Sequence, residues 1–375
     1  MPQQITLFEQ NQNGQIITPL GGGLKSIQII RKIQLIHTYN DIINLENLCL
    51  AWKEFILGRK KKNDVLKFSD NLMDNIVTLH EDLASKIYQH GGYENFYVND
   101  PKRRHIHKAA VCDRLLHHAI YRILYPFFDR TFIDNSFSCR KNKGLHKALN
   151  KFREMFCKVS KNNHRAYWVL KCDIKKFFDS IDHKILLDIL SEYISDKDVI
   201  WLLENVVESY STTPATPLEP LLGNRGTTGL PLGNLTSQLF ANVFMNVFDQ
   251  FVKHKLKVKY YVRYADDFVF LSNDRQYLES IIPVIRNFLV EKLKLTLHPN
   301  KIFLQTITSG IDFLGWKHFV GHRVLRKTTR KRMLRRIKEN HTNETLQSYL
   351  GLLSHGNGGK VKEQLLNEYW FNKNL

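Results

Sequence analysis

The sequence predicts an α+β fold in which helices surround a small group of strands. The chain has 375 residues, of which 43% are hydrophobic, so it can bury a substantial core and has room for two or three coupled subdomains. Apolar residues recur at helical spacing in the N-terminal part of the chain, whereas strand-like runs concentrate in the middle. Strands gathered in one region, with helices before and after them, are typical of this fold class.

The N-terminal part is expected to be a loose leader followed by helices. Residues 1–30 are polar and glycine-containing, which is typical of a segment without a packed core. Helical spacing begins near residue 25 and continues to about Gln89, in runs such as IQIIRKIQLI and FSDNLMDNIVTLHEDLASKIYQ. Two basic pieces follow, and each leads into a further helix. The first, which contains PKRR, is strand-like, and the second, which contains RKNK, is a turn-rich loop.

The strands are expected in the middle of the chain. AYWVLKCD indicates a buried strand that ends at Asp173, shortly before a helix. Residues 211–234 carry the Pro, Gly and Thr residues of a loop and lead into a long helix with one apolar face. The run KYYVRYADDFVFL, residues 259–271, predicts an antiparallel hairpin. Another helix and short strands through GWKHFV follow.

The net charge indicates a polyanionic partner. Lys and Arg number 55 against 36 Asp and Glu, which gives +19 at pH 7, and phosphate backbones attract such an excess. No apolar run of about 18 residues and no signal peptide is found, so we expect no membrane partner. Nine Lys and Arg lie between Arg323 and Lys338, where Met333 and Ile337 form only a narrow apolar stripe. Most of that helix should face water or phosphate.

Cysteine and histidine do not indicate a metal site of their own. The five cysteines are scattered without Cys-x-x-Cys spacing, which favours a reducing cytoplasm over a disulfide framework or a zinc site. The pairs His105/His107 and His117/His118 have no companion ligands nearby in the sequence. We interpret them as surface or packing residues.

Two adjacent aspartates, Asp266 and Asp267, interrupt the apolar hairpin. They could be a polar turn tip, but adjacent carboxylates raise each other's pKa unless a cation neutralises them. The tip also lacks the Gly or Asn that a tight hairpin turn usually needs. Asp173, at the end of another strand, would complete an oxygen cage for Mg²⁺. The rival carboxylates Asp179 and Asp182 are interpreted as solvent-facing or helix-capping residues.

Such a cage would suit phosphoryl transfer on nucleic acid. Two ions about 3.5–4 Å apart activate a 3′-hydroxyl and stabilise leaving pyrophosphate in an in-line displacement. The sequence offers no other catalytic constellation, and its positive charge suits a nucleic-acid substrate.

Seven blocks of the sequence, in the same order, resemble those of reverse transcriptases. The blocks are DPKRRHIHKAAVCDRLLHHAI, FIDNSFSCRKNKGLHKAL, VLKCDIKKFFDSIDH, GLPLGNLTSQLFANVFMN, YYVRYADDFVFL, LTLHPNKIFL and IDFLGW. They lie within about residues 65–355. The resemblance implies a right-hand polymerase with an antiparallel palm sheet packed on helices. N-terminal helices and fingers would span 31–165, the palm 166–320 and a basic helical thumb 321–375.

The block LPLGNLTSQ indicates a branch of that family. Many retroviral and group II intron enzymes carry Gln-Gly and then Ser-Pro here, whereas this chain has Leu232 before Gly233 and ends the block with Ser237 and Gln238. With SYLGLLSHGN in the expected thumb, the pattern resembles the reverse transcriptases of diversity-generating retroelements. These are bacterial and phage cassettes, so we expect a cytoplasmic protein. The compact length, without a Cys/His-rich nuclease tail after the expected thumb, fits the same branch.

Two alternatives stay open. One is a reverse transcriptase of a group II intron or a phage-defence system. The other is a catalytically silent RNA-binding or splicing cofactor on the same fold, although such a protein would be free to lose the three carboxylates that this chain has.

The resemblance implies roles for the residues of the acidic site. Asp173, Asp266 and Asp267, with the backbone carbonyl of Ile174, would bind two Mg²⁺ ions, for which Mn²⁺ could substitute. Lys301 would protonate departing pyrophosphate; the alternative is a merely solvated lysine in a turn.

It also implies a site for the incoming dNTP. Arg104 would grip the triphosphate, and Phe178 would exclude a ribose 2′-hydroxyl unless it is simply a core aromatic beside Phe177. Gly233 and Gln238 complete this expected site. Accurate relatives have glutamine at the position of Leu232, and leucine cannot make its hydrogen bond, so base-pair discrimination should loosen. For this branch the resemblance implies errors opposite template adenines.

The basic regions should contact a template RNA and the growing cDNA, chiefly through phosphates. A small basic accessory protein is a further expected partner. The expected nucleic-acid contacts are Lys102, Arg103, Arg140, Lys141, Lys143, Tyr264, Arg326, Arg330, Arg335 and Arg336.

Overall fold

Helices make up most of the described N-terminal part, as the apolar spacing predicts. The computed structural model describes residues 33–99, 103–162, 164–212 and 227–373. The expected leader at 1–30, Lys102 and most of the loop at 211–234 lie outside these residues. The first helices are α1 (Tyr39–Ile43), α2 (Leu45–Phe55), α3 (Asn63–Asp70), α4 (Leu72–Ala84) and α5 (Val111–Asp129). The buried faces of α1 to α4 contribute Leu48, Phe55 and Leu79 to the core that they share with α5.

A separate two-stranded antiparallel sheet precedes α5. It consists of β1 (Tyr93–Val98) and β2 (Arg104–Ala109), with Tyr93 opposite Ala109 and Val98 opposite Arg104. The sequence predicts only the second of these strands. Five of the six residues of β1 are exposed, so this strand has no buried face that an alternating pattern could reveal.

The central sheet has four antiparallel strands in the order β4-β5-β3-β6. Its strands are β3 (Trp168–Cys172), β4 (Tyr261–Tyr264), β5 (Asp267–Ser272) and β6 (Phe303–Thr306). The helices of this region are α6 (Leu145–Val159), α7 (His183–Ser191), α8 (Lys197–Glu208), α9 (Leu235–Gln250), continued by a π-helical turn at Phe251–Lys255, and α10 (Arg275–Leu293). The expected hairpin and long apolar helix are therefore both present.

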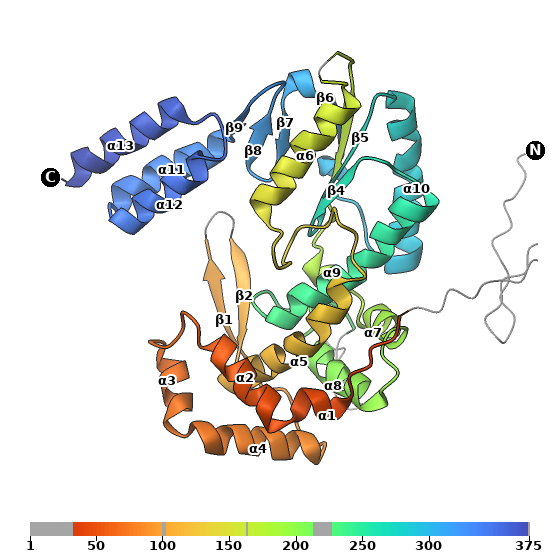
Figure 1. Cartoon of the computed structure of the whole chain (residues 1–375), viewed down its shortest axis with the longest axis vertical. Helices are drawn as coiled ribbons and strands as arrows, with labels where there is room; N and C mark the ends of the chain where they lie inside the picture. Colours follow the sequence, from red (N-terminus) through yellow and green to blue (C-terminus); the bar gives the residue numbers. More distant parts are fainter. Residues whose placement is uncertain (1–32, 100–102, 163, 213–226, 374–375) are drawn as a thin grey trace, which may run out of the picture. The chain divides into compact units, whose positions relative to one another are not determined.

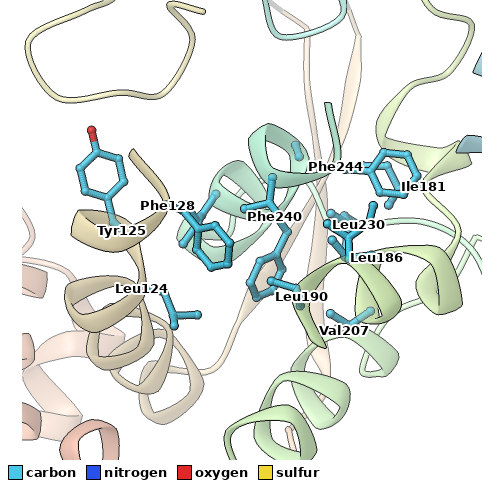
Figure 2. Packing of buried hydrophobic residues seen from close by; sticks show 14 of the residues in the cluster. Leu124, Tyr125, Phe128, Ile181, Leu186, Leu190, Val207, Leu230, Phe240 and Phe244 are labelled. Carbon is cyan, nitrogen blue, oxygen red and sulfur yellow. The ribbon is translucent and has the colours of Figure 1, made fainter. Parts of the chain in front are cut away.

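The central sheet separates two hydrophobic clusters because successive strand residues point to opposite faces. On one face, Leu170, Cys172 and Phe268 join a large cluster with α5, α7, α8 and α9. Figure 2 shows part of this cluster, in which Phe240 of α9 lies between Phe128 of α5 and Leu190 of α7, and Phe244 of α9 lies beside Ile181. On the other face, Val169 and Val269 pack in a second cluster with apolar side chains of α6, the helix that Figure 1 shows beside β4.

The C-terminal part has a small sheet and three helices. The strands β7 (Ile311–Phe313), β8 (Trp316–His318) and β9 (Arg323–Leu325) precede α11 (Lys327–Glu339), α12 (Asn343–Leu353) and α13 (Gly359–Lys373). Met333 and Ile337 are fully buried against α12 and α13, and most basic residues of α11 are exposed, as predicted. The glycine of the SHGN motif, Gly356, lies where any Cβ would overlap the ring of Trp316. The motif therefore lets the chain pass close to β8 between α12 and α13.

The predicted fold class, α+β with an antiparallel sheet packed on helices, is confirmed. Among the described residues, no helix combines the length and the apolar character needed to cross a membrane.

Candidate active site

The register of the central sheet brings two of the predicted carboxylates together. In the antiparallel pair of β3 and β5, Cys172 lies opposite Phe268. Asp173 follows Cys172 and Asp267 precedes Phe268, so both aspartates lie at the same end of these neighbouring strands. Asp266 is in the two-residue connection between β4 and β5. The three carboxylates therefore meet at one end of the sheet, from two distant parts of the chain.

The connection formed by Ala265 and Asp266, here called the acidic turn, has an unfavourable backbone conformation. Tight hairpin turns need a positive φ, usually supplied by Gly or Asn, and Ala265 adopts φ +55° without either. For a residue with a Cβ this conformation costs roughly 1–2 kcal/mol. Arg263 helps to hold it, because its Nη1 donates a hydrogen bond of 3.1 Å to the carbonyl of Ala265.

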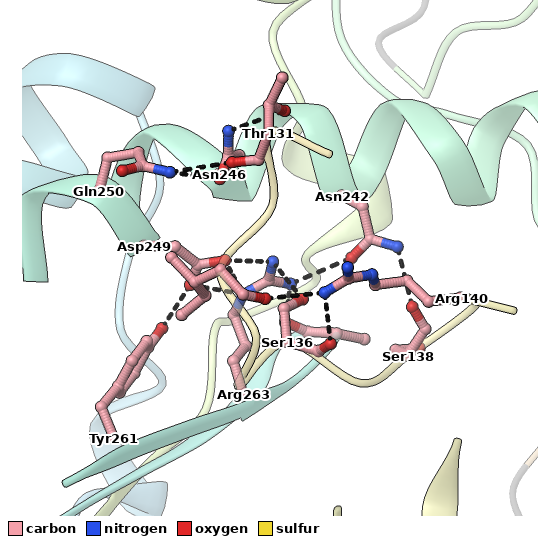
Figure 3. A network of polar contacts seen from close by, with 12 residues as sticks. Thr131, Ser136, Ser138, Arg140, Asn242, Asn246, Asp249, Gln250, Tyr261 and Arg263 are labelled. Atoms are coloured by element: carbon pink, nitrogen blue, oxygen red, sulfur yellow. Dashed lines mark hydrogen bonds and ion pairs between the residues drawn. The ribbon is translucent and has the colours of Figure 1, made fainter. Parts of the chain in front are cut away.

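Arg263 is the centre of a buried polar network (Figure 3). Its side chain is fully buried and makes a bidentate contact with Asp249 of α9, with Nε–Oδ1 at 2.8 Å and Nη2–Oδ2 at 2.6 Å. It also donates to Ser136 Oγ at 2.9 Å, while the hydroxyl of Tyr261 donates to Asp249 at 2.7 Å. One guanidinium thus connects α9, β4, the loop before α6 and the acidic turn.

Two carboxylates of the site, Asp266 and Asp267, have a raised pKa. Burial raises the pKa of Asp266 to about 6, and the charges of Asp173 and Asp267 add to this effect. Burial also raises the pKa of Asp267, against the opposing influence of Lys171. The site therefore favours a cation.

Two lysines already face these carboxylates. Lys301 Nζ donates to Asp173 Oδ1 at 2.9 Å, and Lys171 Nζ lies 3.4 Å from Asp267 Oδ1. All four residues line a cavity of about 320 Å³. Lys171 is not among the site residues predicted from the sequence, although side chains alternate along a strand, which places residue 171 on the same side of the chain as residue 173.

The residues present fit a hard divalent cation. Asp267 Oδ1 is buried and has no hydrogen-bond partner among the described residues, and carboxylate oxygens are the ligands that Mg²⁺ prefers. Within the described residues, the side chains of His, Cys, Asp and Glu form no group of three or more that could hold a metal ion. Mg²⁺ usually keeps several waters and uses substrate phosphates besides one or two carboxylates, so a partial protein shell suits it. Ile174, whose carbonyl is the other expected ligand, is buried next to Asp173.

The residues expected to bind the dNTP lie around β2 and the turn before α9. The backbone N–H of His107 donates to the carbonyl of Leu232 at 3.1 Å. Gly233 has φ +123°, and a Cβ there would crowd Ile106. The Leu232–Gly233 backbone therefore lies directly against β2.

A second cavity, of about 600 Å³, brings together Arg104, Leu232 and the chain beside Phe178. Its lining includes Arg103, Arg104, His107, Lys176, Asp179 and Leu232. Phe178 is half-buried, its ring centre is 5.3 Å from that of Phe177, and its carbonyl accepts from Leu230 N at 2.8 Å. Gln238 is half-buried in the first turn of α9.

Asp179 and Asp182 are solvent-facing or helix-capping residues, and His105 and His107 are surface or packing residues, as interpreted from the sequence. Asp182 is the N-cap of α7, accepting from Ile185 N at 3.0 Å, and pairs with Lys294 at 2.6 Å. Asp179 is exposed. His107 is buried with its ring centre 4.4 Å from that of Tyr210, and His105 stacks on Tyr97 at 4.6 Å.

Arg140 does not suit the predicted contact with nucleic acid. Its side chain is only 6% exposed and pairs with Asp129 at 2.7 Å. It also donates to the carbonyls of Ile133 and Ser136 at 2.7 and 2.9 Å. The sequence shows a basic loop, but this arginine turns inward and supports the loop before α6.

The other predicted contacts lie nearer the surface. Arg103 is exposed over the ring of Tyr97, and Tyr264 is half-buried opposite Asp267. Lys141 is exposed, and Lys143 pairs with Asp134. On and before α11, Arg326 pairs with Asp312, Arg330 donates to Gln364 at 2.7 Å, Arg335 lies 3.5 Å from Glu339 and Arg336 is exposed.

Comparison with known proteins identifies related sequences. Residues 98–318, more than half of the chain, match the family model described as reverse transcriptase (RNA-dependent DNA polymerase). The chain is 25% identical over 286 residues to protein YkfC of Escherichia coli (strain K12). This alignment covers 67% of this chain and 71% of YkfC. It is also 27% identical over 196 residues to the group II intron-encoded protein LtrA of Lactococcus lactis subsp. cremoris. This second alignment covers 52% of this chain and 30% of LtrA.

One solved structure that is similar to this chain is a telomerase from Candida albicans in complex with a fragment of telomeric RNA. It superposes with a TM-score of 0.49 at 14% identity, covering 77% of this chain and 55% of the telomerase chain.

The raised pKa of Asp266 predicts a pH-dependent stability. A carboxyl with a pKa of about 6 in the folded protein, against an ordinary 3.8, stabilises the fold below pH 4, and this contribution is lost as the pH rises through 6. In EDTA, the free energy of unfolding should therefore lose about 1–2 kcal/mol from this group between pH 5 and 8. Asp266→Asn should lack this loss and be more stable than the parent at pH 8.

Urea denaturation at several pH values measures this difference. The Asp188→Asn variant removes one exposed carboxylate of α7, whose ion-pair partner is Lys184, and should keep the parent profile. Parallel pH profiles for the parent and Asp266→Asn would show that the aspartates do not repel one another as described.

Proposed function

The chain belongs to the reverse transcriptase family, and we propose that it copies a template RNA into cDNA at the acidic turn. The observation that carries this proposal is the meeting of Asp173, Asp266 and Asp267 at one end of the central sheet. We assign the fingers to residues 31–165, the palm to 166–320 and the thumb to 321–375.

The acidic side chains would supply the negative charge that holds two divalent ions. When bound, Mg²⁺ ions activate the primer 3′-hydroxyl and stabilise the leaving pyrophosphate. Asp173, Asp266 and Asp267 are the proposed ligands, together with the carbonyl of Ile174. Lys301 lies at the edge of this group, 2.9 Å from Asp173, where its ammonium would donate a proton to the departing pyrophosphate.

The cavity beside β2 is the proposed dNTP site. Arg104 would bind the triphosphate through its guanidinium, which suits phosphate geometry. Phe178, with its backbone fixed by Leu230, would restrict the space for a 2′-hydroxyl. Gly233 keeps the chain close to β2, and Gln238 lies one turn further along.

Leu232 is the basis for proposing a mutagenic enzyme. Its side chain lines the same cavity as Arg104 and offers no hydrogen bond to a nucleotide. The sequence pattern of diversity-generating retroelements then supports a role in copying a template RNA with errors at adenines. Such an enzyme would work in a bacterial cytoplasm with a small basic accessory protein.

A reverse transcriptase of group II intron type is the second candidate. The match to LtrA, named as a group II intron-encoded protein, favours it. Both candidates share the chemistry at the acidic turn and the template and cDNA contacts of the exposed basic residues of α11. They differ in the accuracy expected at Leu232.

The polymerase proposal predicts that Asp266→Asn abolishes primer extension. Loss of a metal ligand removes several kcal/mol of transition-state stabilisation, which corresponds to a rate reduced by roughly 10³-fold or more. The measurement is extension of a primer on an RNA template with dNTPs and Mg²⁺. Asp188→Asn should extend at the parent rate, and extension by Asp266→Asn at that rate would disprove the role of the acidic turn.

The mutagenic proposal predicts that Leu232→Gln lowers misincorporation opposite template adenine. One added hydrogen bond contributes about 0.5–1.5 kcal/mol, so the error frequency should fall by roughly 2- to 10-fold. Sequencing of cDNA from a defined template measures it, with Leu232→Met, which keeps an aliphatic side chain, as the control. Equal adenine errors in all three proteins would favour the intron-type candidate and leave the polymerase assignment intact.

A further inference from the structure

Charged side chains of both signs line the cavity next to the acidic turn. Three carboxylates and three cationic side chains line this space of about 320 Å³, and they come from β3 and the residue after it, the start of β5, β7 and the segments before β6 and α11. The six residues are Lys171, Asp173, Asp267, Lys301, Asp312 and Arg326. Of these, Lys171 has no part in the proposed chemistry.

Lys171 is held between the active site and the C-terminal sheet. Its side chain is 15% exposed, and its Nζ lies 3.4 Å from Asp267 Oδ1. The same Nζ donates a hydrogen bond of 3.1 Å to the carbonyl of Asp312 in β7. The side chain of Asp312 in turn pairs with Arg326. Lys171 is therefore fixed on both sides and cannot move far from Asp267 without losing a contact.

Asp267 depends on Lys171 for its charge balance. Its Oδ1 atom is buried, and no described residue gives it a hydrogen bond. The ammonium group of Lys171, 3.4 Å from this oxygen, is the ion-pair partner of the carboxylate. Without a bound cation, a carboxylate in this position is unfavourable, because buried charges need partners.

We propose that Lys171 is a positioning residue that serves as the internal counter-ion of Asp267 and competes with the divalent ion for it. This inference rests on the proposed function. The ammonium group neutralises Asp267 while the site is empty, and it repels a divalent ion that approaches the same oxygen. Lys171 therefore has opposite effects in the two states: it stabilises the metal-free protein and weakens metal binding.

The second lysine does not duplicate this role. Lys301 pairs with Asp173 but is 37% exposed, so it can follow a leaving group or turn to solvent. Lys171 lies near the end of β3, an inner strand of the sheet, and its contacts continue through Asp312 to Arg326. Because its position is fixed, its positive charge would lower the affinity for a divalent ion by a constant amount.

The test measures Mn²⁺ binding to the full chain, without nucleotide or nucleic acid and at fixed ionic strength, by electron paramagnetic resonance. Lys171→Met keeps the length of the side chain and removes its charge, and it should bind Mn²⁺ about tenfold more tightly than the parent. The melting temperature of Lys171→Met in EDTA should be lower than that of the parent, and Mn²⁺ should raise it by more.

Two further variants isolate the charge. Lys171→Arg should retain the parent affinity, and Lys184→Met, which removes a lysine that is 80% exposed, should do so as well. Lys171→Gln keeps a hydrogen-bond donor toward Asp312 and replaces Lys171→Met if that variant does not fold. Unchanged or weaker Mn²⁺ binding by the folded, uncharged variant would overturn the inference.

The outcome for the parent separates this inference from the proposed function. If the parent binds Mn²⁺ and Asp266→Asn does not, the metal site exists, and the Lys171 variants alone decide the inference. If the parent binds no Mn²⁺ at millimolar concentration, the proposed metal-dependent function fails together with the role of Lys171.

Discussion

A fully buried ion pair between Arg263 and Asp249 is the interaction on which the acidic turn depends. The planar guanidinium makes two parallel contacts with the carboxylate, a geometry that lysine cannot reproduce. Its remaining donors reach Ser136 and the carbonyl of Ala265. Removing one member of such a pair leaves a buried charge without a partner and typically costs about 3–5 kcal/mol. The same contacts fix the strained backbone of Ala265, so the position of the aspartates follows from this pair.

The site that this pair supports is itself unfavourable for stability. Three carboxylates meet where burial raises the pKa of two of them, and a fold selected only for stability would avoid this arrangement. Lysines on either side offset part of the repulsion. A bound divalent ion would offset the rest, which couples the folding of this region to the cation that the chemistry requires. Strain and like-charge repulsion gathered in one place are typical of functional sites.

The sequence predicts the helices, the hairpin and the identity of the acidic residues because these depend on local periodicity and on the ends of strands. It also indicates that Asp179 and Asp182 are solvent-facing or helix-capping residues, and the structure has Asp182 at the N-cap of α7. The inward turn of Arg140 could not be predicted, because a basic loop looks the same whether or not an arginine finds Asp129. β1 escaped prediction because its exposed residues carry no alternating pattern. Lys171 could have been predicted as a neighbour of the site, since strand alternation places it on the same side of the chain as Asp173. Its contact with Asp312 could not, because Asp312 lies in a distant part of the chain.

The central claim is that Asp173, Asp266 and Asp267 together hold divalent ions at a primer end. Anomalous diffraction from crystals grown with Mn²⁺, an RNA template, a DNA primer and a non-hydrolysable dNTP tests it most directly. The account predicts two anomalous peaks at about 2.0–2.2 Å from oxygens of these three aspartates and about 3.5–4 Å from each other. Peaks bound only to phosphates or to other side chains, with the three aspartates left without a metal contact, would contradict it.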